Sequence, residues 1–242
     1  MKRLFSNKIA IVYLLSTVIF VTVETVLGVA LQKNGGREGA FYSMLAVVLA
    51  FLFHFCFFEK SKDYLFTQIA LLFTVLADYF LVWVEPRVKL PAMGFFLVVQ
   101  LCYAARLICS NENRAFRKIQ CVCHFAASLL IVFVTVSVLG KDCDLLALVS
   151  MVYYANLALN LIFAFIGFRK HALLALGLLF FIGCDTCVGI SLIDGYLPIA
   201  ADSPIYRVLY PGFDMVWALY LPAQILLSLS LLPKRFKRLL KS

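Results

Sequence analysis

Charged residues are scarce in this chain: Asp, Glu, Lys and Arg make up 14% of its 242 residues, whereas 64% are hydrophobic. No stretch is left over between the apolar segments for a soluble domain, so the whole chain, residues 1–242, is predicted to be a single transmembrane domain. Histidine is also rare, with three residues, and no two of them are four positions apart. A GxSxG motif is absent as well, so neither a metal centre nor a serine hydrolase is expected.

Some spacings among the eight cysteines resemble those of redox or metal sites, but the surrounding sequence does not support such a site. Cys184-x-x-Cys187 and Cys121-x-Cys123-His124 have redox-like or metal-like spacings, but they lie in apolar segments without further ligands nearby. Cysteine in such a setting behaves as a small apolar residue. No cofactor is expected, and a packing role is predicted for both motifs.

Long apolar runs dominate the chain and predict an all-α bundle of eight transmembrane helices. Each run is close to the roughly 20 residues that cross the hydrocarbon core. The predicted spans are 9–31, 41–58, 64–84, 90–109, 115–139, 145–168, 171–193 and 212–232.

The net charge of +9 is explained by topology better than by a nucleic-acid partner. With the N-terminus in the cytoplasm, one side of the membrane collects 16 of the 22 Lys and Arg residues, and the other side collects six. The positive-inside rule therefore predicts that both termini are cytoplasmic. The tail PKRFKRLLKS is expected to lie against anionic lipid headgroups.

An apolar octapeptide that ends in aspartate occurs twice, as LLFTVLAD (71–78) and LLFFIGCD (178–185). An ionised carboxylate at the centre of a bilayer costs roughly 2.5–3.5 kcal/mol on the insertion scale, so both aspartates are expected to be functional. Asp78 and Asp185 are each the fifteenth residue of a span that runs outward, which places both about 21 Å from the cytoplasmic end. The recurrence is compatible with a parallel repeat of four spans plus four, and also with chance in a Leu- and Phe-rich chain.

Polar residues at helical spacing give several spans a polar stripe, Tyr153 in the span 145–168 among them. A single polar residue in a span more often forms an interhelical hydrogen bond than belongs to a functional site. Taken together with the two aspartates, the set predicts a buried polar cavity. The residues expected to bind substrate there are Glu24, Gln100, Tyr103, Asn156, Asn160, Tyr220 and Gln224.

Two carboxylates without a metal or a nucleophile favour general acid–base catalysis. Close acids in a site of low dielectric share a proton, so one is protonated while the other is ionised near neutral pH. Such a pair suits an acid-labile bond that water attacks. The residues alone do not name the substrate.

Four short motifs, spread over essentially the whole chain, carry a family resemblance. They are Leu71-Leu72-Phe73 with Asp78, Gly94-Phe95 with Gln100 and Tyr103, the run from Phe181 to Asp185, and Tyr220 with Gln224. With these motifs the sequence resembles the YhhN family, membrane proteins that include the lysoplasmalogenases of animals. It departs from the family pattern at Ala77, Cys184, Lys60-Ser61 and Gln100, where the family usually has Gly, Ser, Lys-Pro and often His. The change at Gln100 bears on any proton relay there.

The resemblance implies a metal-independent ether hydrolase of lipid metabolism. Its substrate would be a lysophospholipid, a lysoplasmalogen whose vinyl ether is cleaved to a fatty aldehyde and a glycerophospho-alcohol. Asp78 would act as the acid and Asp185 as the base, although a coupled pair can exchange these roles. Two other classes stay open: a proton-coupled transporter of a small or lipid-like solute, and a non-catalytic lipid-binding protein. Mid-membrane acids and the Pro222 break in the last span also suit a transporter.

Overall fold

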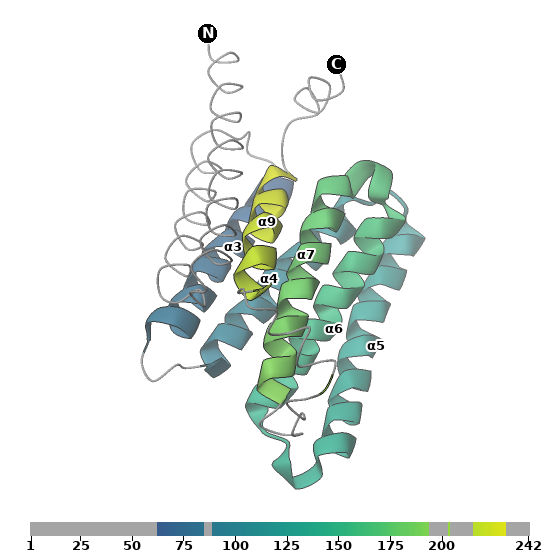
Figure 1. Ribbon diagram of the computed structural model, residues 1–242. Coiled ribbons are helices and arrows are strands. Elements are labelled where there is room, and N and C mark those ends of the chain that lie inside the picture. The colour runs from purple at the N-terminus through teal and green to yellow at the C-terminus, as the bar shows by residue number, and fades with distance from the viewer. Residues whose placement is uncertain (1–61, 85–88, 194–202, 204–214, 231–242) are drawn as a thin grey trace.

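The computed structural model describes residues 62–84, 89–193, 203 and 215–230 (Figure 1). Their regular structure is helical, as the sequence predicts. The elements are α3 (Lys62–Asp78), a π-helix η1 (Tyr79–Trp83), α4 (Lys89–Ser110), α5 (Arg114–Leu139), a short 3-10 helix η2 (Gly140–Asp142), α6 (Leu145–Ile166), α7 (Phe168–Ile193) and α9 (Met215–Leu229).

Within the described residues, four helical segments are long and apolar enough to cross a membrane: Lys89–Ser110, Arg114–Asp142, Leu145–Ile166 and Phe168–Ile190. They match the predicted spans 90–109, 115–139, 145–168 and 171–193 to within a few residues. Shorter apolar helices, Leu65–Leu81 and Ala218–Leu229, fall inside the predicted spans 64–84 and 212–232. These helices indicate a multi-pass membrane protein.

Part of the predicted architecture lies beyond the described residues. The spans 9–31 and 41–58, and with them Glu24, fall in the part of the chain that the structure does not describe. The total of eight spans, the four-plus-four repeat and the cytoplasmic location of both termini therefore stay predictions.

Short connections between α4, α5 and α6 are defined by their capping residues. The Asn113 side chain accepts hydrogen bonds from the backbone N–H groups of Ala115 (2.9 Å) and Phe116 (3.2 Å), so α5 begins directly after it. The Asp144 side chain caps α6 in the same way. Gly140, with φ of +54°, ends α5 in a conformation that most residues avoid. Successive helices consequently run antiparallel.

The start of α7 is bent at His171, the residue at which the predicted span 171–193 begins. Its φ of −121° and ψ of 25° are not helical, although regular structure resumes on both sides. His171 Nε2 lies 3.1 Å from Ser110 Oγ, and Lys170 donates a hydrogen bond to the Ser110 carbonyl oxygen. These contacts hold the end of α4 against the start of α7.

The buried core lies among α3, α4, α6, α7 and α9, whereas α5 lies at the edge of the bundle beside α6 (Figure 1). Phe125 and Phe133 on α5 are 69% and 70% exposed. Lipid tails are as apolar as these side chains, so an exposed apolar face is the expected surface of a helix that faces lipid.

Close packing between α7 and α9 depends on a glycine. A Cβ atom at Gly177 would lie 2.9 Å from Leu227 Cγ and 3.0 Å from the Leu227 backbone nitrogen. Only glycine lets the two backbones approach this closely, as small residues generally do in membrane helices. The approach fixes the position of α9, which carries Tyr220 and Gln224.

Candidate active site

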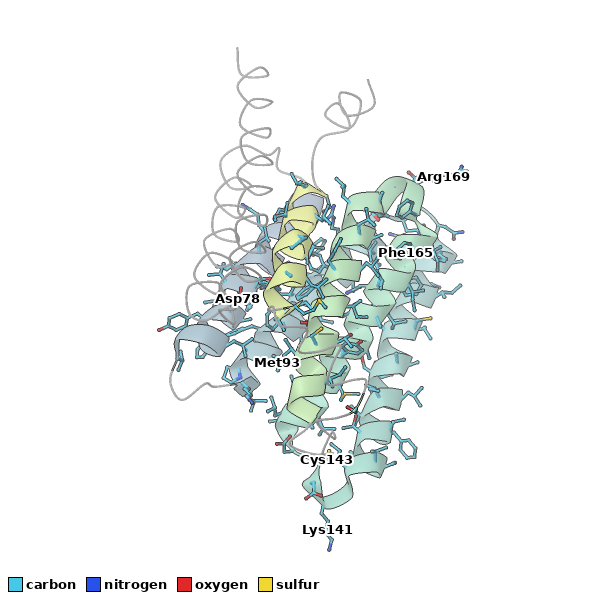
Figure 2. All side chains as sticks on the ribbon, in the orientation of Figure 1. Asp78, Met93, Lys141, Cys143, Phe165 and Arg169 are labelled. Carbon is cyan, nitrogen blue, oxygen red and sulfur yellow. The ribbon has the colours of Figure 1, made fainter. Side chains whose placement is uncertain are left out.

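Asp78 lies at the junction of α3 and the π-helix η1 and is 3% exposed. The Tyr220 hydroxyl, from α9, donates a hydrogen bond of 2.7 Å to Asp78 Oδ2. Single π turns are frequent at functional sites. Figure 2 labels Asp78 between the two ends of the bundle, which are marked by Arg169 and Lys141.

Asp185 lies on α7 and is held in a similar way from α6. The Tyr153 hydroxyl donates a hydrogen bond to Asp185 Oδ2. Tyr153 is 4% exposed, and Asp185 is partly buried. Each aspartate thus has a phenol from a different helix as its hydrogen-bond donor.

The two Asp–Tyr pairs are joined by aromatic rings. The ring centroids of Tyr220 and Phe181 are 5.8 Å apart, those of Phe181 and Phe96 are 5.9 Å apart, and those of Phe96 and Tyr153 are 5.7 Å apart. Aromatic rings at these separations are in favourable contact. The structure therefore brings the two pairs into one continuous cluster.

Electrostatic interactions also cross between the pairs. The carboxylates of Asp78 and Asp185 interact with one another, and each interacts with the tyrosine that binds the other. In an apolar interior such interactions are weakly screened. The two carboxyl groups are therefore close enough for the charge on one to influence the other.

Gln100 on α4 and Asn160 on α6 contact each other directly. Asn160 Nδ2 donates to the Gln100 carbonyl oxygen (2.8 Å) and to Gln100 Oε1 (3.1 Å), and both residues are fully buried. Tyr103, one turn along α4 from Gln100, is also fully buried, as is Gln224 on α9 at 1% exposure. These predicted site residues lie in the bundle interior. Asn160 and Gln224 are on the helices that supply the two tyrosines, α6 and α9, whereas Gln100 and Tyr103 are on α4, which supplies Phe96.

Asn156 points elsewhere. Its Oδ1 lies 2.8 Å from His124 Nδ1, and its Nδ2 donates to Ser128 Oγ (3.0 Å), so its side chain bonds to α5. Among the predicted substrate-binding residues within the described part of the chain, Asn156 alone is held by α5.

Tyr153, Phe96 and Phe181 are site residues that the sequence prediction omitted. The polar stripe of the span 145–168 included Tyr153, but nothing in the spacing of the residues distinguished it from Asn156. Phe181 appeared in the sequence analysis only as the first residue of the motif that ends in Asp185. Phe96 gave no signal, since the chain contains 23 phenylalanines.

A family model described as the YhhN family matches residues 40–231. The chain belongs to the YhhN family. This family includes lysoplasmalogenases. Searches of the curated proteins and of the solved structures found no match. The matched residues of this YhhN protein include both aspartates and both tyrosines of the cluster.

The YhhN cluster contains carboxyl and phenol groups as its ionisable side chains. Within the described residues, no three His, Cys, Asp or Glu side chains are grouped so that they could hold a metal ion. A pair of carboxyl groups that share protons can donate a proton to a substrate and accept one from water. This capacity is the basis of the proposal below.

Proposed function

We propose that this protein hydrolyses the vinyl ether of a lysoplasmalogen within the membrane. The products are a fatty aldehyde and a glycerophospho-alcohol. The observation that carries the proposal is the cluster of two Asp–Tyr pairs joined by Phe96 and Phe181 in a member of a family that includes lysoplasmalogenases.

The reaction needs one acid and one base. Asp78, in its protonated form, gives a proton to the vinyl carbon distal to the ether oxygen, which leaves an oxocarbenium ion. Asp185, in its ionised form, takes a proton from a water molecule as that water adds to the carbon beside the oxygen. The resulting hemiacetal collapses to the aldehyde and the alcohol. The proton that Asp185 gained returns to the leaving oxygen, and the hemiacetal hydroxyl proton returns to Asp78.

Burial favours this assignment of roles. Asp78 is almost completely enclosed, which suits a group that meets only the apolar vinyl chain. Asp185 is less enclosed, which suits a group that must meet water. In both pairs the phenol binds Oδ2, which leaves Oδ1 for proton exchange. The tyrosines are positioning residues, because they act on the aspartates rather than on the substrate.

The test is release of fatty aldehyde from a lysoplasmalogen by the purified protein in detergent. Asp78→Asn and Asp185→Asn keep the size of each side chain and remove its acid or base function. Each single change is expected to lower turnover by at least roughly 100-fold, the lower end of what general acid–base groups contribute. The double variant is expected to lose little more than the worse single variant, because groups that act as a unit are not additive. Full activity in either variant would end the acid–base proposal.

A proton-coupled transporter is the second candidate. Pro222 lies inside α9, which continues as one helix from Met215 to Leu229, and its ring nitrogen has no N–H to donate to the Ala218 carbonyl oxygen. A proline-weakened helix beside buried acids is typical of transporters. Proton-dependent uptake into vesicles, without release of aldehyde, would favour this candidate. Aldehyde release in detergent, where no gradient exists, favours the hydrolase.

A further inference from the structure

Cationic side chains gather at the end of the bundle where α4 leads into α5 and α6 leads into α7. Four of them are exposed and one, that of Arg117, is half-buried. This group, the basic cluster, comprises Arg114, Arg117, Lys118, Arg169 and Lys170. Among the residues that the structure describes, none of these cations forms an ion pair, although the carboxylate of Glu112 lies in the connection next to them. Their positive charge is therefore left to interact with an external anion.

Contacts between helices hold the two connections of this end against each other. Lys170 donates a hydrogen bond to the Ser110 carbonyl oxygen, and His171 Nε2 lies 3.1 Å from Ser110 Oγ. The ring centroids of Phe116 and Phe163 are 6.0 Å apart, which joins the first turn of α5 to the last turn of α6. The cations of α5 and those of α7 consequently belong to one packed surface.

The opposite end has a balanced charge among the described residues. There the cations Lys89 and Lys141 are accompanied by the acids Asp142 and Asp144. Figure 2 labels Lys141 at this end and Arg169 at the other. The excess of positive charge in the described part of the chain thus faces one side of the membrane, as it does in proteins that bind the headgroups of anionic lipids.

Two exposed phenylalanines lie next to the cations in the chain. Phe165 and Phe168 are 42% and 41% exposed, and their rings are stacked with centroids 5.6 Å apart and planes 5° apart. Arg169 follows Phe168 directly. Apolar side chains beside cations suit the boundary between acyl chains and headgroups. A soluble anion would use the cations alone, whereas a lipid would also cover the phenylalanines.

We propose that the basic cluster binds the phosphate group of an anionic phospholipid, whose acyl chain packs against Phe165 and Phe168. Arginine suits this ligand, because its planar guanidinium group can donate two parallel hydrogen bonds to two phosphate oxygens. The site lies at one end of the bundle, whereas Asp78 lies between the two ends (Figure 2). The proposal therefore does not depend on the hydrolase function.

The experiment measures thermal unfolding of the purified full-length protein in a neutral detergent. The protein is titrated with phosphatidylglycerol, or with phosphatidylcholine that has the same acyl chains. A ligand that binds the folded state raises the unfolding temperature by mass action, so each titration reports an affinity. The wild-type protein is expected to bind the anionic lipid roughly 25- to 100-fold more tightly, since two or three cations contribute about fivefold each. High salt is expected to reduce this preference.

Two double variants separate the basic cluster from net charge. Arg117→Gln combined with Arg169→Gln removes one cation from α5 and one from α7, and is expected to bring the preference below roughly fivefold. Lys89→Gln combined with Lys141→Gln is the matched control, because it removes the same charge from the opposite end. The control is expected to keep the wild-type preference. An equal loss in the two variants would mean that net charge alone attracts the lipid, and would overturn the site.

Arg114→Gln combined with Lys118→Gln changes exposed residues only, and serves if the first variant folds poorly. It is also expected to lower the preference. Glycerol phosphate, which carries the phosphate without an acyl chain, is expected not to stabilise the protein at the concentrations used for the lipid. Equal stabilisation by glycerol phosphate would overturn a lipid ligand. A wild-type protein without preference, or a full preference in both variants of the basic cluster, would overturn the proposal altogether.

Discussion

Two neighbouring tyrosines on α6 offer a direct test of the paired-carboxyl mechanism. Tyr153 and Tyr154 both bond to α7, 32 residues further along the chain: Tyr153 donates to Asp185, and the Tyr154 hydroxyl lies 2.8 Å from Thr186 Oγ1. Tyr153→Phe and Tyr154→Phe each remove one oxygen and one hydrogen bond between the same two helices. Only Tyr153→Phe removes a donor to a proposed catalytic group.

The expected magnitude follows from the chemistry of the two acceptors. A hydrogen bond to a charged group contributes ~1.5–3 kcal/mol, against ~0.5–1.5 kcal/mol for a neutral pair. If the bond from Tyr153 positions the ionised base through the reaction, its loss lowers kcat roughly 10- to 150-fold, at 1.36 kcal/mol for each factor of ten. The bond from Tyr154 ends on a threonine, so its loss is expected to lower stability by about 1 kcal/mol and to leave kcat unchanged.

The assay measures aldehyde release and thermal unfolding for both variants in the same detergent. A double-mutant cycle of Tyr153→Phe with Asp185→Asn, read by stability, isolates the coupling between the two side chains, expected at roughly 0.5–3 kcal/mol. Equal losses of kcat in the two phenylalanine variants would refute the reasoning. So would strict additivity in the cycle, because the bond would then contribute nothing specific.

Four further outcomes are expected. Gly177→Val places a side chain against the Leu227 backbone and displaces α9, so it is expected to destabilise the protein by about 1–3 kcal/mol and to lower activity. Gly189→Ala is the control on the same helix, because a Cβ atom there meets nothing within 4 Å. Turnover is expected to follow a bell-shaped pH profile whose limbs belong to the coupled pair, and a single limb would contradict this. Activity is expected to withstand EDTA; loss that a divalent ion restores would replace acid–base hydrolysis by metal-assisted hydrolysis. Accessibility labels at residues 2 and 240 are both expected to react from the cytoplasmic side of the membrane. Reaction of the two labels from opposite sides would contradict the predicted topology.

The helices of the described part of the chain were predictable from the sequence because each one is a local property. A run of about 20 apolar residues satisfies its own backbone hydrogen bonds only as a helix, and charged or Gly-containing breaks end it. The cap at Asn113 and the turn at Gly140 needed only their immediate neighbours. The π turn after Asp78 had no such local signal, and neither did the bend at His171, which depends on a contact with Ser110 in another helix.

The sequence predicts a shared depth for the two acids, but it does not predict the hydrogen-bond partners of the site residues. A constant rise of 1.5 Å per residue predicts that Asp78 and Asp185 lie at the same depth, and this stays a prediction. The sequence placed Tyr153, Asn156 and Asn160 on one stripe, because they are three and four residues apart. In the structure these three side chains bond to three different helices: Tyr153 to α7, Asn156 to α5 and Asn160 to α4.

The sequence by itself therefore determined which segments of the described part of the chain are helices and which residues form a polar stripe on each. The tertiary structure alone decided which phenol meets which carboxylate and that Asn156 bonds to α5. The reason is geometric. A polar stripe defines only the directions in which side chains leave one helix. A buried helix has several neighbours, and its rotation about its own axis decides which neighbour each side chain meets. Packing such as that of Gly177 against Leu227 sets this rotation.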